Sequence, residues 1–116
     1  MTDPFGKELI RGNLDLMVLS VLREGPQYGY LIQKNLREAS ANRVRLPAGT
    51  LYPLLHRLET EKLVRTKTED TSGRPRKWYE LTAAGKRRLQ DRADQWRALA
   101  QCMEQLLGAA PRPETN

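Results

Sequence analysis

The stretch that decides the fold is PAGTLYPLLHRLETEKLV, residues 47–64. It carries leucines at helical spacing, yet Pro53 lies in the middle of them. A proline inside a helix removes one backbone hydrogen bond and costs about 3 kcal/mol, whereas the first turn has no intrahelical partner to lose. We therefore predict a helix from about Thr50 to Lys62, with Thr50 as its N-cap and Pro53 in its first turn. The alternative is a start at Pro47, which would place Pro53 one turn deeper and bend the helix.

The predicted helix has two different faces. Leucines recur at i, i+4 and i+7 and are expected to point into the core: Leu51, Leu55 and Leu58. The opposite face is aromatic and basic rather than merely charged, and it carries Tyr52, Pro53, His56, Arg57 and Thr60. This outward face is the candidate contact surface of the helix.

Two further helices are predicted upstream. Residues 7–23 form one helix whose apolar residues cover more than one face, so it is expected to be buried on several sides. Gly25 and Pro26 end it, since glycine suits a C-cap and proline cannot continue a helix. Residues 28–39 form a second, shorter helix, which is broken at residues 40–42.

The downstream part predicts a β-hairpin and a long helix. Residues 63–70 and 77–82 are rich in β-branched and basic residues, and a glycine-containing turn at 71–76 joins them. Thr82 is expected to cap a helix over residues 83–107. Its apolar positions step by 4, 3, 4, 3 and 4, as on a coiled-coil seam: Leu89, Ala93, Trp96, Ala100, Met103 and Leu107.

This order of elements predicts a mainly α fold with a small β-hairpin. We expect a winged helix-turn-helix domain over residues 7–82, a dimerisation helix over 83–107 and a disordered tail over 108–116. The residues expected to hold the dimer are Leu89, Trp96, Met103 and Leu107.

The composition narrows the setting and the chemistry. A chain of 116 residues has room for about one domain. Its single cysteine, Cys102, cannot form an internal disulfide, and one cysteine with one histidine cannot complete a zinc site. No signal peptide is expected, and the longest apolar run, residues 16–22, is far below the ~20 residues that span a bilayer. We expect a cytoplasmic protein that binds no metal or cofactor and does not enter a membrane.

Positive charge is concentrated in one third of the chain. The net charge is +6, and residues 43–77 hold nine basic and four acidic residues, a net of +5, whereas residues 1–42 hold five of each. A basic patch this concentrated in a small domain indicates a polyanionic partner.

Three blocks of the sequence together resemble the PadR-like transcriptional regulators. They are LIRGNLDLMVLSVLREGPQYGYLIQKNL, PAGTLYPLLHRLETEKLV and GRPRKWYELTAAGKRRL, and the likeness covers about residues 8–107. The blocks GTLYPLLHRLE and RKWYELTAAG, in that order, are the specific part. Members of the family are dimeric bacterial DNA-binding proteins, mostly repressors, and the length matches the short subfamily with one C-terminal helix.

The resemblance implies roles for individual residues. The GTLYP segment matches the start of the recognition helix, which makes Thr50, Tyr52 and His56 candidates for the major groove, with Arg57 beside them. YGY places Tyr30 near phosphate, and GRPRK places Arg74 and Lys77 on the wing, against the DNA backbone or in the minor groove. The chain departs from the family pattern at Leu46, where many relatives have a polar capping residue.

Trp96 is a candidate for binding a small effector. Ala93 and Ala100 flank it on the seam, so two such rings could face each other across a hollow between subunits. Aromatic residues of this helix line a drug-binding pore in some PadR-like regulators, and flat aromatic pairs stack well on planar hydrophobic ligands. The alternative is a closed seam in which the indoles are core. Cys102 has no neighbouring base that would make it a redox switch.

Other classes of function fit the sequence less well. Catalysis is not expected, because no nucleophile is paired with a base and the acids are scattered. The predicted strands lack the paired aromatics of an RNA stacking platform. A winged helix that binds only proteins is the alternative, although such domains usually have neutral or acidic wings. The preferred reading is a dimeric, sequence-specific repressor that binds a roughly palindromic duplex and is released by a planar hydrophobic compound.

Overall fold

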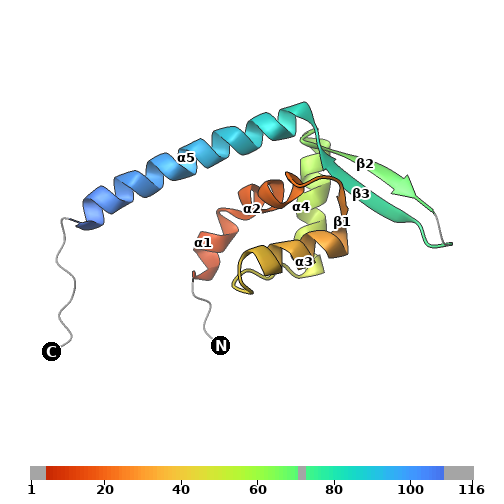
Figure 1. Cartoon of the computed structure of the whole chain (residues 1–116), viewed down its shortest axis with the longest axis horizontal. Helices are drawn as coiled ribbons and strands as arrows, with labels where there is room; N and C mark the ends of the chain where they lie inside the picture. Colours follow the sequence, from red (N-terminus) through yellow and green to blue (C-terminus); the bar gives the residue numbers. More distant parts are fainter. Residues whose placement is uncertain (1–4, 71–72, 109–116) are drawn as a thin grey trace.

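The computed structural model describes residues 5–70 and 73–108. Its elements follow one another as α1 (Lys7–Arg11), α2 (Leu14–Leu22), β1 (Gln27–Tyr28), α3 (Gly29–Ala39), α4 (Ala48–Thr60), β2 (Val64–Glu69), β3 (Arg76–Leu81) and α5 (Ala83–Gly108). Helices α2, α3 and α4 form the body, the β2–β3 hairpin projects from one end, and α5 extends away on the other side (Figure 1). This mainly helical winged arrangement with a long last helix confirms the predicted fold class.

The sheet has three antiparallel strands in the order β1-β3-β2. The hairpin was predicted, and its register pairs Val64 with Leu81 and Glu69 with Arg76. The short strand β1 was not predicted, because two residues are too few to show an alternating pattern. It pairs Tyr28 with Trp78, which ties the segment before α3 to the wing.

One apolar core joins the helices to the base of the hairpin. Val18 and Leu19 from α2, Ile32 from α3, and Leu51 and Leu55 from α4 have no exposed surface. Leucines at i, i+4 and i+7 of α4 therefore face inward as predicted, since Leu58 is buried too.

The prediction of one helix over residues 7–23 is wrong. The chain breaks at Gly12 and Asn13, where the Asn13 side-chain amide donates a hydrogen bond of 2.8 Å to the Leu9 carbonyl. Glycine is a weak helix former, and a short amide that bonds a nearby carbonyl competes with the helical ladder. The two helices consequently differ in burial. Leu9 of α1 is exposed, whereas Val18 and Leu19 of α2 are buried.

The predicted start of α4 at Thr50 is also wrong, and the alternative start is the one observed. Pro47 is the N-cap, and its carbonyl accepts hydrogen bonds of 2.9 Å from the backbone N–H groups of Thr50 and Leu51. Leu46 is buried, and the Gln33 side chain donates to its carbonyl at 2.8 Å, which fixes where the helix begins. Pro53 therefore lies inside α4.

The start of α5 is as predicted. The Thr82 hydroxyl accepts a hydrogen bond of 3.0 Å from the backbone N–H of Gly85 and donates one of 2.7 Å to the Lys62 carbonyl. The helix ends at Gly108, one residue beyond the expected end. The rest of the predicted tail, residues 109–116, lies outside the described residues. None of the helices within 5–70 and 73–108 is long and apolar enough to span a membrane.

Candidate nucleic-acid interface

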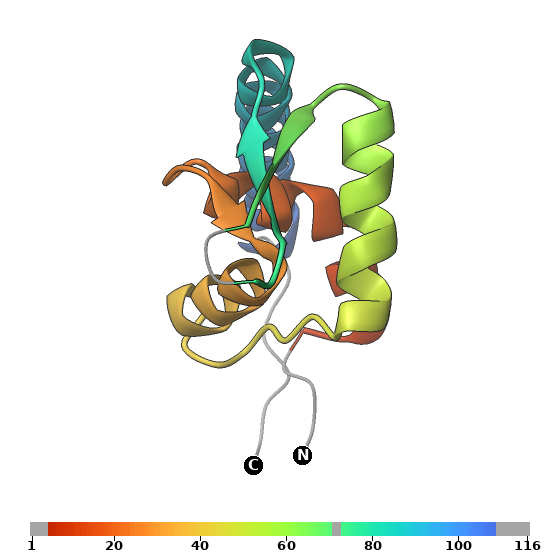
Figure 2. The same cartoon turned by 90° about the vertical axis from the view of Figure 1, so that its right-hand side faces the viewer.

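Helix α4 presents its aromatic and polar face on the side of the body next to the wing. Tyr52 is 46% exposed, and Pro53, His56 and Thr60 are exposed as well. We call the β2–β3 hairpin, residues 64–81, the wing. Seen from its end of the molecule, α4 lies beside the wing and α3 lies below the wing (Figure 2). The consecutive helices α3 and α4 and the wing therefore contribute to one end of the molecule.

Tyr52 is held in place by a glycine. A Cβ at residue 29 would overlap the hydroxyl and ring carbons of Tyr52, so the ring lies directly over the Gly29 backbone. Gly29 is the first residue of α3 and is buried. Tyr52 thus packs one face on the domain while nearly half of the side chain stays exposed, and only glycine at residue 29 leaves room for it. No sequence pattern indicates this contact, because it depends on how closely α3 and α4 approach each other.

Tyrosines surround a shallow hollow between α3, α4 and the wing. Its volume is about 460 Å³, and its lining includes Tyr28, Tyr30, Tyr52, Lys77 and Tyr79. Tyr30 is exposed, whereas Tyr79 is buried at the base, and burial raises the pKa of Tyr79 above its ordinary value. The hollow offers hydroxyl groups and a cation, a combination that suits phosphate oxygens.

Lys77 is also tied to α4. Its ammonium lies 3.3 Å from a carboxylate oxygen of Glu59, and the Thr66 hydroxyl donates a hydrogen bond of 2.9 Å to the other oxygen. The Thr66 hydrogen bond is the main cause that lowers the pKa of Glu59, and Lys77 adds to the effect. Glu59 therefore partly neutralises the charge of Lys77, and it places one carboxylate at the edge of a basic surface.

The wing carries two arginines in different surroundings. Arg74 lies at the exposed tip, directly after Gly73, whose φ of 75° suits glycine. The Arg76 guanidinium lies 4.4 Å from the centre of the Tyr28 ring, which in turn meets Trp78 edge-on at 5.1 Å. Arg76 thus packs the wing against the segment before α3, whereas Arg74 remains available at the tip.

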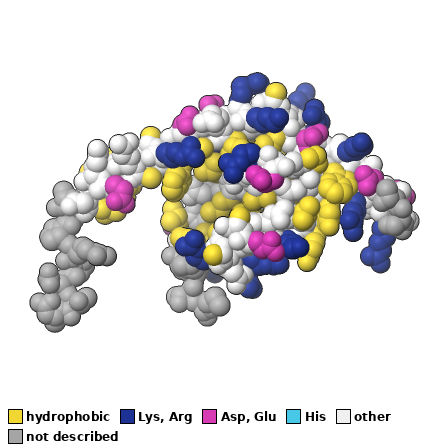
Figure 3. Space-filling model, viewed as in Figure 1, with side chains coloured by type: hydrophobic (Ala, Val, Ile, Leu, Met, Phe, Trp, Pro, Cys, Tyr) yellow, Lys and Arg dark blue, Asp and Glu magenta, His cyan; other side chains and the backbone are white. Residues whose placement is uncertain are grey.

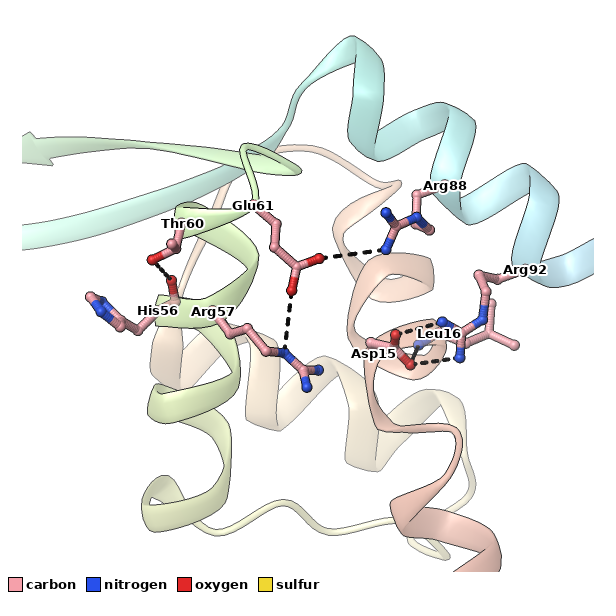
Figure 4. A network of polar contacts seen from close by, with 8 residues as sticks. All are labelled: Asp15, Leu16, His56, Arg57, Thr60, Glu61, Arg88 and Arg92. Carbon is pink, nitrogen blue, oxygen red and sulfur yellow. Dashed lines mark hydrogen bonds and ion pairs between the residues drawn. The ribbon is translucent and has the colours of Figure 1, made fainter.

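Arg57 lies apart from the other predicted contact residues. Its guanidinium pairs with Glu61 at 3.8 Å, and it lines a different hollow together with Asp15 and Arg92. In Figure 4, His56 and Arg57 point to different sides of α4. The structure therefore brings Tyr30, Tyr52 and Lys77 to one hollow and places His56 on the adjoining part of α4. Thr50 is exposed near the start of the helix, and Arg57 faces α2 and α5.

The predicted seam of α5 is only partly covered within one protomer. Leu89 packs against the core, and Ala93 and Ala100 are half-buried, whereas Trp96 is 51%, Met103 41% and Leu107 59% exposed. Leu99 and Leu106 are exposed beside them and extend the apolar face beyond the predicted positions. Such a row of exposed apolar residues on one helix marks a candidate interaction surface.

Trp96 lies between two hollows. One, of about 640 Å³, is almost entirely apolar and lies between α1, α2, the end of α3 and α5, with Met17 and Met103 in its lining. Apolar side chains gather on the side of the body that faces α5 (Figure 3). The other, of about 520 Å³, lies toward the base of the hairpin, where Arg23 and Lys86 contribute to its rim. Cys102 is exposed on the same helix.

No cluster of metal-ligating side chains occurs within residues 5–70 and 73–108.

The chain matches the family model described as "Transcriptional regulator PadR-like family" over residues 18–91. A relative, the transcriptional regulator Rv3488 of Mycobacterium tuberculosis, is 40% identical over 81 residues, which cover 69% of this chain and 72% of the relative.

Solved structures agree. The crystal structure of a PadR family transcriptional regulator from Eggerthella lenta shares 39% identity at a TM-score of 0.80, covering 89% of this chain and 88% of that one. A PadR family transcription regulator from Clostridium difficile shares 35% identity at a TM-score of 0.73, covering 83% and 99%. The family consists of transcriptional regulators that bind DNA and generally dimerise. The chain belongs to the PadR-like family, and it is a transcriptional regulator.

Proposed function

We propose that the protein binds a specific duplex as a two-fold homodimer in the cytoplasm and represses transcription. The observation that carries this proposal is the junction of Tyr30, Tyr52 and Lys77 at one hollow beside an exposed basic wing. A protein-binding winged helix is the second candidate. The net charge of +5 over residues 43–77 favours DNA.

The contacts divide between reading bases and positioning the backbone. Helix α4 enters the major groove. Thr50, Tyr52 and His56 contact the groove, because all three side chains are exposed on this helix. Tyr30 at the start of α3 meets a phosphate. Arg74 at the wing tip reaches the neighbouring backbone or minor groove, where negative potential favours arginine. Arg57 lies on another side of α4 and contributes charge rather than a direct contact.

Residues 7–82 act as the DNA-binding domain and residues 83–107 as the dimerisation helix. The exposed apolar residues of α5 support this division, because the body of the protomer leaves them uncovered. A two-fold dimer places its recognition helices about one DNA turn, or ~10 base pairs, apart. The expected operator is therefore roughly palindromic.

The test is duplex affinity measured against salt concentration. A duplex selected by the protein from a random pool is compared with a scrambled one. Arg74→Ala is expected to weaken both complexes and to reduce the salt slope by about one unit, because it removes one cation from the backbone or groove. Arg97→Ala, on α5, removes the same charge far from the proposed surface and serves as control. A protein that selects no sequence, or whose affinity ignores salt, would refute DNA binding.

The apolar surroundings of Trp96 favour a second role, the binding of a planar hydrophobic effector that lowers operator affinity. Trp96 and Ala100 line an almost purely apolar hollow, and Ala93 lines the neighbouring hollow toward the base of the hairpin. A ligand that prefers one arrangement of the subunits by about 2–3 kcal/mol would change DNA binding by tens to hundreds of fold.

Fluorescence tests the effector role. In a Trp78→Phe background, titration with flat aromatic dyes should quench Trp96 saturably, at one dye per dimer, because the two rings form one site. Phe at residue 78 keeps the edge contact with Tyr28 and removes the competing emission. If no dye quenches Trp96, the residue is part of a closed seam.

A further inference from the structure

Two arginines on one side of α5 connect this helix to the DNA-binding domain. Arg88 and Arg92 are one helical turn apart, and they reach two different helices (Figure 4). Arg92 pairs with Asp15 in the first turn of α2, and Arg88 pairs with Glu61, the C-cap of α4. We call these two ion pairs the clamp.

The Arg92–Asp15 pair is the stronger half of the clamp. It is bidentate, with guanidinium–carboxylate distances of 2.8 and 3.0 Å, and the two side chains are only 32% and 17% exposed. Asp15 also accepts a hydrogen bond of 3.0 Å from the backbone N–H of Leu16. A bidentate pair with both partners held is geometrically specific, unlike a single contact between two mobile side chains.

The Arg88–Glu61 pair is weaker but reaches the recognition helix. Its atoms are 3.6 Å apart, both side chains are more than 40% exposed, and Glu61 also pairs with Arg57 at 3.8 Å. Salt screens such pairs. The clamp therefore has one firm bond to α2 and one soft bond to the end of α4.

Besides the packing of Leu89 and of the half-buried Ala93 and Ala100, few polar contacts hold the direction of α5. Its first turn is fixed by Thr82 and by Gly85, where a Cβ would overlap the Leu63 carbonyl. Within residues 5–70 and 73–108, Arg92 is the last residue of α5 that hydrogen-bonds another element. The helix then projects past the body to Gly108 (Figure 1).

This projection turns a small change of angle into a large displacement. At a rise of about 1.5 Å per residue, α5 continues for about 24 Å beyond Arg92, so a tilt of ~10° moves its far end by ~4 Å. With the far end held in a dimer, the same tilt displaces the DNA-binding domain instead. One base step of DNA is about 3.4 Å, so the tilt corresponds to one base pair of half-site spacing.

From this geometry we propose that the clamp, and above all the Arg92–Asp15 pair, fixes the angle of α5 and thereby selects the half-site spacing. Asp15, Arg88 and Arg92 are positioning residues, since none lies on the proposed DNA surface. The inference rests on the proposed function for its effect on spacing, but the angle itself is a property of each protomer.

The first experiment measures the angle without DNA. In a Cys102→Ser background, nitroxide labels are attached at Lys34→Cys in α3 and Gln101→Cys in α5. Pulsed electron paramagnetic resonance then measures the distance between the two labels, and hence between the DNA-binding domain and α5. Both positions are exposed, and labelled protein is diluted with unlabelled protein so that each dimer carries at most one labelled protomer. Arg92→Gln is expected to broaden the distance distribution. Arg97→Gln, which removes the same charge at a residue with no ion pair in the described part of the chain, should leave it unchanged.

The second experiment measures spacing. The duplex that the wild-type protein selects is compared with versions whose spacer is longer or shorter by one or two base pairs. The wild-type protein should lose at least ~10-fold in affinity on the altered spacers, because two half-sites are no longer engaged together. Arg92→Gln and Asp15→Asn should bind all spacers within about threefold of one another while keeping the affinity of the intact protein for a single half-site, which a loss of folding would not do.

The outcomes separate the inference from the proposed function. An unchanged label distance in Arg92→Gln overturns the clamp, whatever the DNA results. A broadened distance with an unaltered spacing preference overturns the role in spacing. If the wild-type protein selects no duplex, the proposed function fails and the spacing role with it, whereas a broadened distance would still assign the clamp as the support of α5.

Discussion

Replacing Met103 and Leu107 together by aspartate is expected to give a monomer that has lost most of its affinity for the selected duplex. Both side chains lie outside the buried core, with Met103 41% and Leu107 59% exposed, so the change should leave the body folded. In a dimer the new carboxylates would be desolvated without partners, which opposes association. A monomer binds one half-site without the gain from linked binding, which is worth about 10²–10⁴ in affinity. Sedimentation and duplex titration measure the two effects.

The matched control uses the opposite side of the same helix. Gln101→Asp with Gln105→Asp adds the same charge at exposed positions that do not belong to the apolar face. This variant should remain dimeric and bind the duplex nearly as well as the parent. A Met103/Leu107 variant that still sediments as a dimer would show that the protomers associate through another surface.

The elements that could be predicted from the sequence are those with a repeated pattern. The leucines of α4, the hairpin and the long helix α5 each repeat a helical or strand period over several residues, and the structure has these elements where they were expected. The boundaries that depended on single competing contacts were missed. One hydrogen bond of the Asn13 side chain interrupts the first helix, and one hydrogen bond of the Gln33 side chain fixes the start of α4. A single hydrogen bond leaves no periodic pattern in the sequence, so neither boundary could be predicted.

The candidate site divides in the same way. An exposed aromatic on α4 and arginines on the wing follow from the pattern of faces and turns. The fit of Tyr52 over Gly29 does not, because it depends on how closely α3 and α4 approach. The ion pair of Asp15 with Arg92 joins residues 77 positions apart, and charge alone offered many other partners. Arg57 likewise shares a helix with Tyr52 but pairs on another side of it.

Replacing Tyr52 by alanine is expected to weaken binding to the selected duplex by about five- to a hundredfold, the effect of a base-edge contact worth about 1–3 kcal/mol. Binding to scrambled DNA should fall by less than about threefold, because that complex depends on phosphate contacts. Equal losses on both duplexes would contradict a role in recognition. Competition titrations at one salt concentration measure the ratio.

Gly29→Ala tests whether the position of the Tyr52 ring matters as much as its presence. The new methyl group would occupy the space of the Tyr52 hydroxyl, and the ring must swing away, since the side chain is the flexible partner. Alanine is otherwise favourable in a helix, so thermal unfolding should change little. The variant should therefore lose specific affinity nearly as Tyr52→Ala does, while scrambled DNA is bound as before.

The double variant completes the argument. If Gly29→Ala acts through the Tyr52 ring, it should add almost nothing to Tyr52→Ala, because the group that it displaces is already gone. Residues in contact deviate from additivity in this way, whereas independent sites add. Fully additive losses would mean that alanine at residue 29 disturbs the start of α3 directly, and with it Tyr30 and its proposed phosphate contact. If the two losses of affinity are non-additive and thermal unfolding is unchanged, the α3–α4 contact contributes to sequence recognition. Gly29 then affects binding only through the position of the Tyr52 ring.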